Sequence, residues 1–334
     1  MPREKLGTPS ADARTGSDRW RGVRILEDVT SLRGRLAEGP VLLDGGLSTT
    51  LEQLGHDISG DLWSARLLQD EPTAIEQAHR AFFEAGAEVA TTVTYQATFP
   101  GFAAHGVDPD TTELLMRRSV ELARSAGAGV SDPTWVAASA GPYGAMLADG
   151  SEYTGDYGLT VDQLREFHRP RLAVLADAGA DVVAFETIPC AAEVEAVLAE
   201  IDGTGIDAWL SVSIDGSRTH AGEPLTDVFA MTRGIDELIA VGVNCSAPSD
   251  ATSAVTVAAA SGHPVVIYPN SGEGWDAVNR TWLSAGEDAD AEVWPVQQWV
   301  DDGARLVGGC CRIGPAQIEA IGRSLYRGRL QHGH

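Results

Sequence analysis

Three cysteines stand where the sequence could build a metal centre. Cys245 ends the apolar run LIAVGVNC, and Cys310 and Cys311 end the run ARLVGGCC. Thiolate sulfur is a preferred ligand of zinc, and a catalytic zinc keeps one coordination position open for substrate. Neighbouring side chains on a strand point to opposite faces, so the vicinal pair needs a bent backbone, which Gly308 and Gly309 would permit. The pattern therefore predicts a zinc site with three thiolate ligands.

Two other interpretations of these cysteines stay open. Free cysteines are often simply small buried residues, and Cys310 and Cys311 could instead form a vicinal disulfide. The eight histidines form no HxH or HExxH pattern, which disfavours a histidine-based metal site. The fourth cysteine, Cys190, begins a helix after ETIP and is interpreted as structural.

Two carboxylates also end apolar runs. Asp44 lies in LLDGGLSTTL and Glu186 in AFETIPC. A carboxylate at the end of a buried strand is costly unless it is paired or faces a polar site. Both side chains could therefore receive the amino group of a ligand, although Asp44 could instead cap the turn that follows it.

The elements that must position these residues are short apolar runs separated by stretches of helical period. The runs span 41–46, 88–95, 135–142, 181–188, 207–214, 238–245, 264–271 and 304–310. Consecutive apolar residues are typical of parallel strands covered by helices on both faces. Helices are expected between them, among others over 72–86, 160–179 and 314–328.

Eight strands alternating with helices predict the α/β class and a (β/α)8 TIM-type barrel that forms a single domain over residues 36–330. An open doubly wound sheet is the alternative. In a barrel the active site lies at the carboxyl ends of the strands. The cysteines and carboxylates would therefore meet at one mouth.

Residues 1–35 are polar and are expected to form a flexible N-terminal extension that leads into a short helix. They contain no apolar stretch typical of a secretory signal, and no apolar run in the chain reaches the ~18 residues of a membrane span, so a cytoplasmic protein is expected. With 48 acidic against 24 basic residues the formal charge is -24, which disfavours nucleic acid and anionic membranes as partners. Nothing in the sequence indicates the oligomeric state.

Two loops are rich in aromatic residues. The loop over 141–158 carries three tyrosines among acidic residues, Tyr143, Tyr153 and Tyr157. The loop over 268–282 adds Trp275 and Trp282. Aromatic faces beside carboxylates suit a cationic ligand. Ordinary packing of tyrosines under a surface loop is equally consistent with the pattern.

Seven motifs together resemble the homocysteine S-methyltransferase family. They are LLDGGLSTTLEQLG, TYQAT, AMLADGSEYTGDYG, FETIPC, GVNCSAP, YPNSGE and GGCCRIGP, and they are spread over residues 41 to about 325. The pattern is most like that of the stand-alone bacterial and plant enzymes that use S-methylmethionine. GVNC and GGCC at these two places are the most specific part of the resemblance.

The resemblance implies a barrel in which Cys245, Cys310 and Cys311 hold Zn²⁺. It also implies that Asp44 and Glu186 hold the amino group of homocysteine. By the same likeness, two further residues are expected beside the substrate, Asn244 and Tyr95.

The implied reaction is zinc-dependent transfer of a methyl group from a cationic sulfonium donor to the thiol of L-homocysteine, which gives methionine. S-methylmethionine is the expected donor and S-adenosylmethionine the second, although no glycine-rich nucleotide fingerprint follows a strand. A betaine-type or other thiol methyltransferase is an alternative on the same barrel. Alternatives of other classes are a non-catalytic zinc or thiol redox sensor and a metal-dependent barrel hydrolase that uses Asp44 and Glu186.

Overall fold

The computed structural model describes residues 30–56, 67–272, 275–276, 281–282 and 294–327. Eight strands form one sheet: β1 (Val41–Leu42), β2 (Val89–Thr91), β3 (Trp135–Ala140), β4 (Val182–Ile188), β5 (Ala208–Val212), β8 (Leu238–Asn244), β9 (Val265–Tyr268) and β12 (Ala304–Val307). Each strand lies inside one of the eight predicted apolar runs, so the predicted strands are confirmed.

The sheet closes on itself. Its strand order is β1-β12-β9-β8-β5-β4-β3-β2, and every pairing in it is parallel. A parallel bridge between Leu43 and Val89 joins β1 to β2, the two ends of that order. The structure is therefore a (β/α)8 barrel, as predicted, and the alternative of an open doubly wound sheet is wrong.

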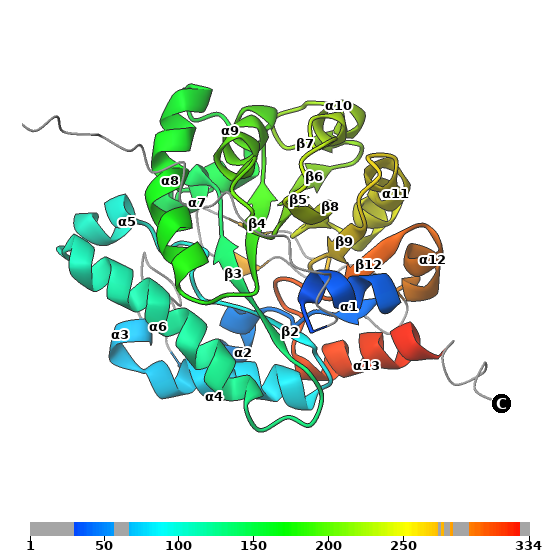
Figure 1. The fold of residues 1–334 in the computed structure, drawn as a ribbon, viewed down its shortest axis with the longest axis horizontal. Helices are drawn as coiled ribbons and strands as arrows, with labels where there is room; N and C mark the ends of the chain where they lie inside the picture. The colour runs from blue at the N-terminus through cyan, green and yellow to red at the C-terminus, as the bar shows by residue number, and fades with distance from the viewer. Residues whose placement is uncertain (1–29, 57–66, 273–274, 277–280, 283–293, 328–334) are drawn as a thin grey trace, which may run out of the picture.

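Helices surround the barrel (Figure 1). The main ones are α4 (Pro72–Glu84), α6 (Pro109–Gly127), α8 (Val161–Asp177), α9 (Ala191–Ile201), α10 (Leu225–Ala230), α11 (Pro248–Ala259), α12 (Val296–Asp301) and α13 (Pro315–Tyr326). Proline occupies the first turn of α4, α6, α11 and α13, where its missing N–H costs nothing. Thr160 and Gln163 form a capping box that begins α8. The three helices named from the sequence are present, each ending about two residues early.

The apolar strands serve two cores. Val41, Leu43 and Trp209 belong to a cluster inside the barrel, whereas Leu42 and Leu210 belong to the larger cluster between the strands and the helices. Alternate residues of a strand point to opposite faces, and both faces are buried here. This is why the runs are apolar at consecutive positions instead of alternating.

Short elements complete the described fold. They are α1 (Leu32–Glu38), α2 (Leu47–Gln53), α3 (Leu67–Asp70), α5 (Phe99–Ala104), α7 (Tyr143–Leu147), the 3-10 helix η3 (Ser151–Tyr153), and the two-stranded pairs β6 (Ile214–Asp215) with β7 (Arg218–Thr219) and β10 (Trp275–Asp276) with β11 (Thr281–Trp282).

The predicted extension falls mostly on residues 1–29, which lie outside the described residues, so its flexibility stays a prediction. The short helix expected after it is α1, which Arg33 ties to the barrel through an ion pair of 2.6 Å with Asp207. The side chains of Trp275 and Trp282 also lie outside the described residues. In the part of the chain that is described, no helix is both long and apolar enough to span a membrane.

Candidate active site and metal centre

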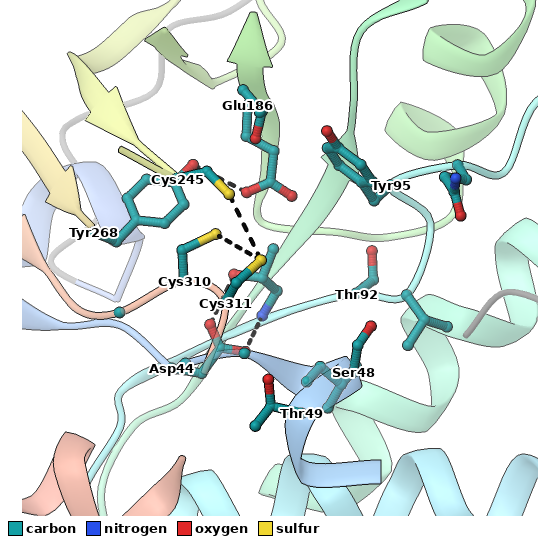
Figure 2. Close-up of a pocket in the computed structure, with 18 of the residues that line it drawn as sticks. Asp44, Ser48, Thr49, Thr92, Tyr95, Glu186, Cys245, Tyr268, Cys310 and Cys311 are labelled. Carbon is teal, nitrogen blue, oxygen red and sulfur yellow. Dashed lines mark hydrogen bonds between the residues drawn. The ribbon is translucent and has the colours of Figure 1, made fainter. Parts of the chain in front are cut away.

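A cavity opens at the carboxyl ends of the strands (Figure 2). Residues at or just beyond the ends of β1, β2, β4, β8, β9 and β12 line it, together with residues of α2 and η3. The three cysteines lie on one side of the cavity and the ring of Tyr95 on the other, while Ser48 and Thr49 of α2 lie below. The mouth of the barrel thus holds the polar groups that end otherwise apolar strands.

The three thiols converge on one point. The Cys245 and Cys311 sulfurs are 3.6 Å apart, the Cys310 and Cys311 sulfurs are 3.9 Å apart, and all three lie within 4.8 Å of one another. Sulfurs placed ~2.3 Å from a tetrahedral zinc are separated by roughly 3.8 Å, so this set fits the ion. A disulfide needs an S–S distance of ~2.05 Å, and the cysteines are free here.

The backbone around the thiols is unusual. Cys245 adopts the left-handed conformation with φ 49°, and Arg312, directly after the vicinal pair, has φ 65°. The strand β12 ends at Val307, so the chain leaves strand geometry at Gly308 and Gly309, although neither glycine has a positive φ. They are required because a Cβ on Gly308 would lie 2.6 Å from Leu43 Cβ, and one on Gly309 would lie 2.2 Å from a side-chain carbon of Ile313.

The three thiols of the cluster differ in the direction in which their pKa is shifted. Hydrogen bonds from Cys310 and Cys311, and then from Tyr153, bring the pKa of the Cys245 thiol well below its usual range. The same sharing with Cys245 raises the pKa of Cys310 and of Cys311. The protein alone therefore favours one thiolate among the three, and a cation bound at the cluster would favour ionisation of the other two.

Asp44 is a buried carboxylate held by β2. Its two oxygens accept hydrogen bonds from Thr91 N at 2.7 Å and from Thr91 Oγ1 at 2.9 Å. Burial raises its pKa to about 8, against the effect of these hydrogen bonds. Its side chain thus faces the neighbouring strand and the cavity, and its oxygens accept from Thr91 instead of capping the turn that follows Asp44, the alternative considered from the sequence.

Glu186 is held from two sides. Its carboxylate accepts a hydrogen bond from Ser139 Oγ and one of 3.0 Å from the Tyr268 hydroxyl. Tyr268 is itself fixed by Trp209 Nε1 at 3.1 Å and by Ser211 Oγ at 2.6 Å. Burial raises the pKa of Glu186 to about 7. Sequence reasoning did not single out Ser139 or Tyr268, although Tyr268 begins the YPNSGE motif.

Tyr95 and Asn244 lie in different surroundings. Tyr95 lines the cavity, whereas Asn244 is fully buried and does not line it. The Asn244 amide accepts from Thr187 N at 2.7 Å and donates to Thr187 Oγ1 at 2.8 Å. Thr187 has φ 62°, a strained conformation for a β-branched residue, so Asn244 holds the residue next to Glu186.

The loop over 141–158 divides its tyrosines between the two roles considered from the sequence. Tyr143 packs on Tyr157 and on Phe167, with ring centroids 5.3 and 5.0 Å apart. Tyr153 instead lines the cavity, with its hydroxyl 3.8 Å from Cys245 Sγ. Beside it, Glu152 also lines the cavity, a residue that the sequence did not single out.

Acidic groups dominate the cavity. Its lining contains the carboxylates of Asp44, Glu152 and Glu186 and the three thiols, and none of the described residues that line it is a lysine, an arginine or a histidine. Burial raises the pKa of Glu152 to about 7, much as for the other two carboxylates. A cation bound in this cavity would favour the ionised forms of these groups, and the lining supplies no positive side chain that does so. Cys190 is buried and lies outside this lining.

Fold and site thus define a (β/α)8 barrel with a thiol cluster at its catalytic face. Comparison with known proteins identifies the family. The family model for homocysteine S-methyltransferase matches residues 41–325. Homocysteine S-methyltransferase of Escherichia coli strain K12 is 44% identical over 291 residues, which cover 84% of this chain and 94% of that protein. Homocysteine S-methyltransferase 4 of Zea mays is 42% identical over 327 residues, covering 92% and 96%.

A solved structure and a further relative are also similar to this chain. The metallated form of the homocysteine methyltransferase MmuM from Escherichia coli superposes with a TM-score of 0.78 at 39% identity, over 88% of this chain and 99% of that one. Selenocysteine Se-methyltransferase of Brassica oleracea is 40% identical over 309 residues, which cover 86% of this chain and 89% of that protein. The chain belongs to the homocysteine S-methyltransferase family and is a methyltransferase.

Proposed function

We propose that the protein transfers a methyl group from a sulfonium donor to the thiol of L-homocysteine in a zinc-dependent reaction that yields methionine. S-methylmethionine is the proposed first donor and S-adenosylmethionine the second. The observation that carries the proposal is the cluster of three thiols within 4.8 Å at a cavity lined by carboxylates and tyrosines. A cytoplasmic location is part of the same proposal.

Cys245, Cys310 and Cys311 would hold the zinc ion, since their sulfur separations match a tetrahedral site. Zinc supplies the positive charge that keeps a bound thiol deprotonated at neutral pH. Backbone hydrogen bonds fix the three ligands: Cys245 N donates to Tyr268 O at 3.2 Å, Cys310 N donates to Pro269 O at 2.8 Å, and Cys311 O accepts from Ser271 N at 3.3 Å.

Asp44 and Glu186 would bind the amino group of homocysteine. Both are oriented by hydrogen bonds that leave their charge uncompensated by any protein cation among the lining residues. A bound ammonium group lowers the pKa of each carboxyl from its raised value, so the pair is ionised when the substrate is present. Asn244 would be a positioning residue, because it binds Thr187, the neighbour of Glu186 in the chain. Tyr95 would line the side of the cavity opposite the thiols.

The reaction needs little proton chemistry from the protein. The homocysteine sulfur forms a bond to the methyl carbon while the bond from that carbon to the sulfonium sulfur breaks, and its electron pair stays on the donor sulfur. A thiolate and a sulfonium thereby become two neutral thioethers. Opposite charges disappear along the path, so a water-poor cavity lined by tyrosines favours the reaction. The lack of a histidine base in the lining agrees with this chemistry.

The test is methionine formation from homocysteine by zinc-loaded protein, with S-methylmethionine, S-adenosylmethionine and betaine offered separately. We expect product from a sulfonium donor, with loss of activity and of bound zinc in Cys245→Ala. Cys190→Ala is the matched control, because Cys190 is a buried cysteine outside the cavity, and it should keep both. Product from betaine alone would contradict the donor assignment. Bound zinc without product from any donor would favour the redox sensor.

A further inference from the structure

Glu152 is the cavity carboxylate that the proposed binding of homocysteine does not use. Its side chain is 5% exposed and lines the cavity, and its Oε2 has no hydrogen-bond partner. In Asp44 and Glu186, by contrast, both carboxylate oxygens accept hydrogen bonds. Burying a carboxylate oxygen without a partner costs free energy. A bound ligand with a positive charge would offset this cost.

The loop holds Glu152 firmly in this place. Gly144 in α7 contacts η3 so closely that a Cβ there would lie 2.4 Å from Glu152 N. The start of the loop is tied down by Gln96, whose Nε2 donates to Ala145 O at 2.8 Å, and by Glu193, whose Oε1 accepts from Tyr143 N at 2.6 Å. The position of the carboxylate is therefore built by the fold and not by a freely moving loop.

The surroundings of Glu152 combine negative charge with aromatic rings, which suits a sulfonium cation. Tyr153 follows it in sequence and Tyr95 also lines the cavity, and the Tyr153 hydroxyl is 3.8 Å from Cys245 Sγ. A sulfonium carries its charge on a sulfur without any N–H or O–H, so it is bound by negative charge and aromatic faces. The place beside Cys245 is also next to where an acceptor thiol would meet the metal.

We propose that Glu152, with the rings of Tyr95 and Tyr153, forms the subsite for the positively charged sulfur of the methyl donor. This inference rests on the proposed function, since it assigns the donor side of the same cavity. Glu152 and the two rings would attract the sulfonium and hold its methyl group toward the acceptor sulfur, while Asp44 and Glu186 serve the acceptor.

The kinetic consequence follows from the loss of charge during transfer. The donor sulfur is fully charged in the bound ground state and only partly charged in the transition state, so Glu152 binds the ground state more strongly. In Glu152→Gln, which keeps the shape and removes the charge, we expect the KM for the sulfonium donor to rise ~10- to 100-fold. We expect kcat to stay level or rise, because the lost interaction weakens as the reaction proceeds.

Two controls separate this role from damage to the loop. The KM for homocysteine and the zinc content should not change in Glu152→Gln. Asp156→Asn removes the same charge from an exposed position in the same loop and should leave the donor KM unchanged. A fall in kcat of Glu152→Gln with an unchanged donor KM would overturn the proposal.

The sharpest readout compares a charged donor with its neutral counterpart. In 2-amino-5-methylhexanoate a CH group replaces the sulfonium of S-methylmethionine, and the rest of the molecule is the same. Its Ki as a competitor of S-methylmethionine at saturating homocysteine should stay the same in Glu152→Gln. A Ki that rises in parallel with the donor KM would show that Glu152 binds the donor's ammonium group, which overturns the proposal.

Failure of this inference differs from failure of the proposed function. Active wild-type protein with an unaffected Glu152→Gln variant would contradict the donor subsite alone. Wild-type protein that forms no methionine from any sulfonium donor would contradict both.

Discussion

The molecule buries two groups of carboxylates in opposite ways. In the cavity, Asp44, Glu152 and Glu186 have no positive side chain beside them in the lining. Under the loop over 141–158, Glu193 is fully buried but accepts from His168 Nε2 at 2.8 Å. Arg171, also buried, contacts His168 Nδ1 at 2.6 Å and donates to Gly141 O. We call Glu193, His168 and Arg171 the closed network.

The difference shows how the same residue types serve structure and function. The closed network contains Arg171, whose positive charge interacts with the carboxylate of Glu193, and Glu193 anchors the loop by accepting a hydrogen bond from Tyr143 N. In the cavity, the charge of the carboxylates can be compensated only by a bound ligand or metal ion, because the lining holds no positive side chain. A buried carboxylate next to a protein cation is thus interpreted as structural, and a buried carboxylate without one as a binding site for a cation.

The largest effect is expected at the thiols. Cys310→Ser replaces one of three soft ligands, so bound zinc and methyl transfer should both fall to background. Metal content by mass spectrometry and methionine formation measure the two quantities. A variant that retained zinc and full activity would show that the cluster does not act as a metal site.

Loss of the closed network should cost stability instead of binding. Glu193→Ala leaves the Arg171 charge uncompensated in the interior, so the free energy of unfolding should fall by about 3–5 kcal/mol. Urea denaturation measures the change, and Glu195→Ala is the control because Glu195 is exposed on the same helix. An unchanged free energy of unfolding in Glu193→Ala would contradict the structural role given to the closed network, which distinguishes it from the cavity carboxylates.

Acid should weaken the closed network through His168. Burial, and next the charge of Arg171, lower the pKa of His168 from 6.5 to about 4. Above pH 6.5 the ring is neutral in both states and the full stability is present. As pH falls from 6.5 to 4 the unfolded chain takes up the proton first, so stability decreases by about 3 kcal/mol over this window. The same denaturation series in His168→Gln should show a shallower pH dependence, and an identical slope would contradict this assignment.

The smallest of these effects concerns Asp44. Asp44→Asn keeps the shape of the side chain but removes the charge offered to the homocysteine ammonium, so the homocysteine KM should rise ~10-fold or more. Bound zinc and the free energy of unfolding should stay close to wild type. A variant that instead lost stability while its homocysteine KM stayed unchanged would place Asp44 with the structural carboxylates.

The sequence predicted the barrel well because eight apolar runs, buried on both faces, leave few other topologies. It also predicted that Cys245, Cys310 and Cys311 would meet, since parallel strand ends share one face. It could not show that Gly308 and Gly309 serve close packing, because those contacts involve Leu43 and Ile313, far away in the chain.

The pocket role of Glu152 was also hidden in the sequence. It lies in η3, in a segment with several acidic residues, and only the fold shows that Glu152 is buried in the cavity lining that also contains Cys245, while Asp156 is exposed. Asn244 was likewise expected beside the substrate from the family resemblance, and its partner Thr187 became visible only when β4 and β8 were placed in space.

The most direct test of the account is zinc K-edge X-ray absorption on the zinc-loaded protein before and after addition of homocysteine. The account predicts three protein sulfur ligands at ~2.3 Å and a fourth sulfur when homocysteine binds. Fewer than three sulfur ligands in the absence of homocysteine, or no change in sulfur coordination on its addition, would contradict the proposal that the cysteine cluster presents the acceptor thiol to the methyl donor.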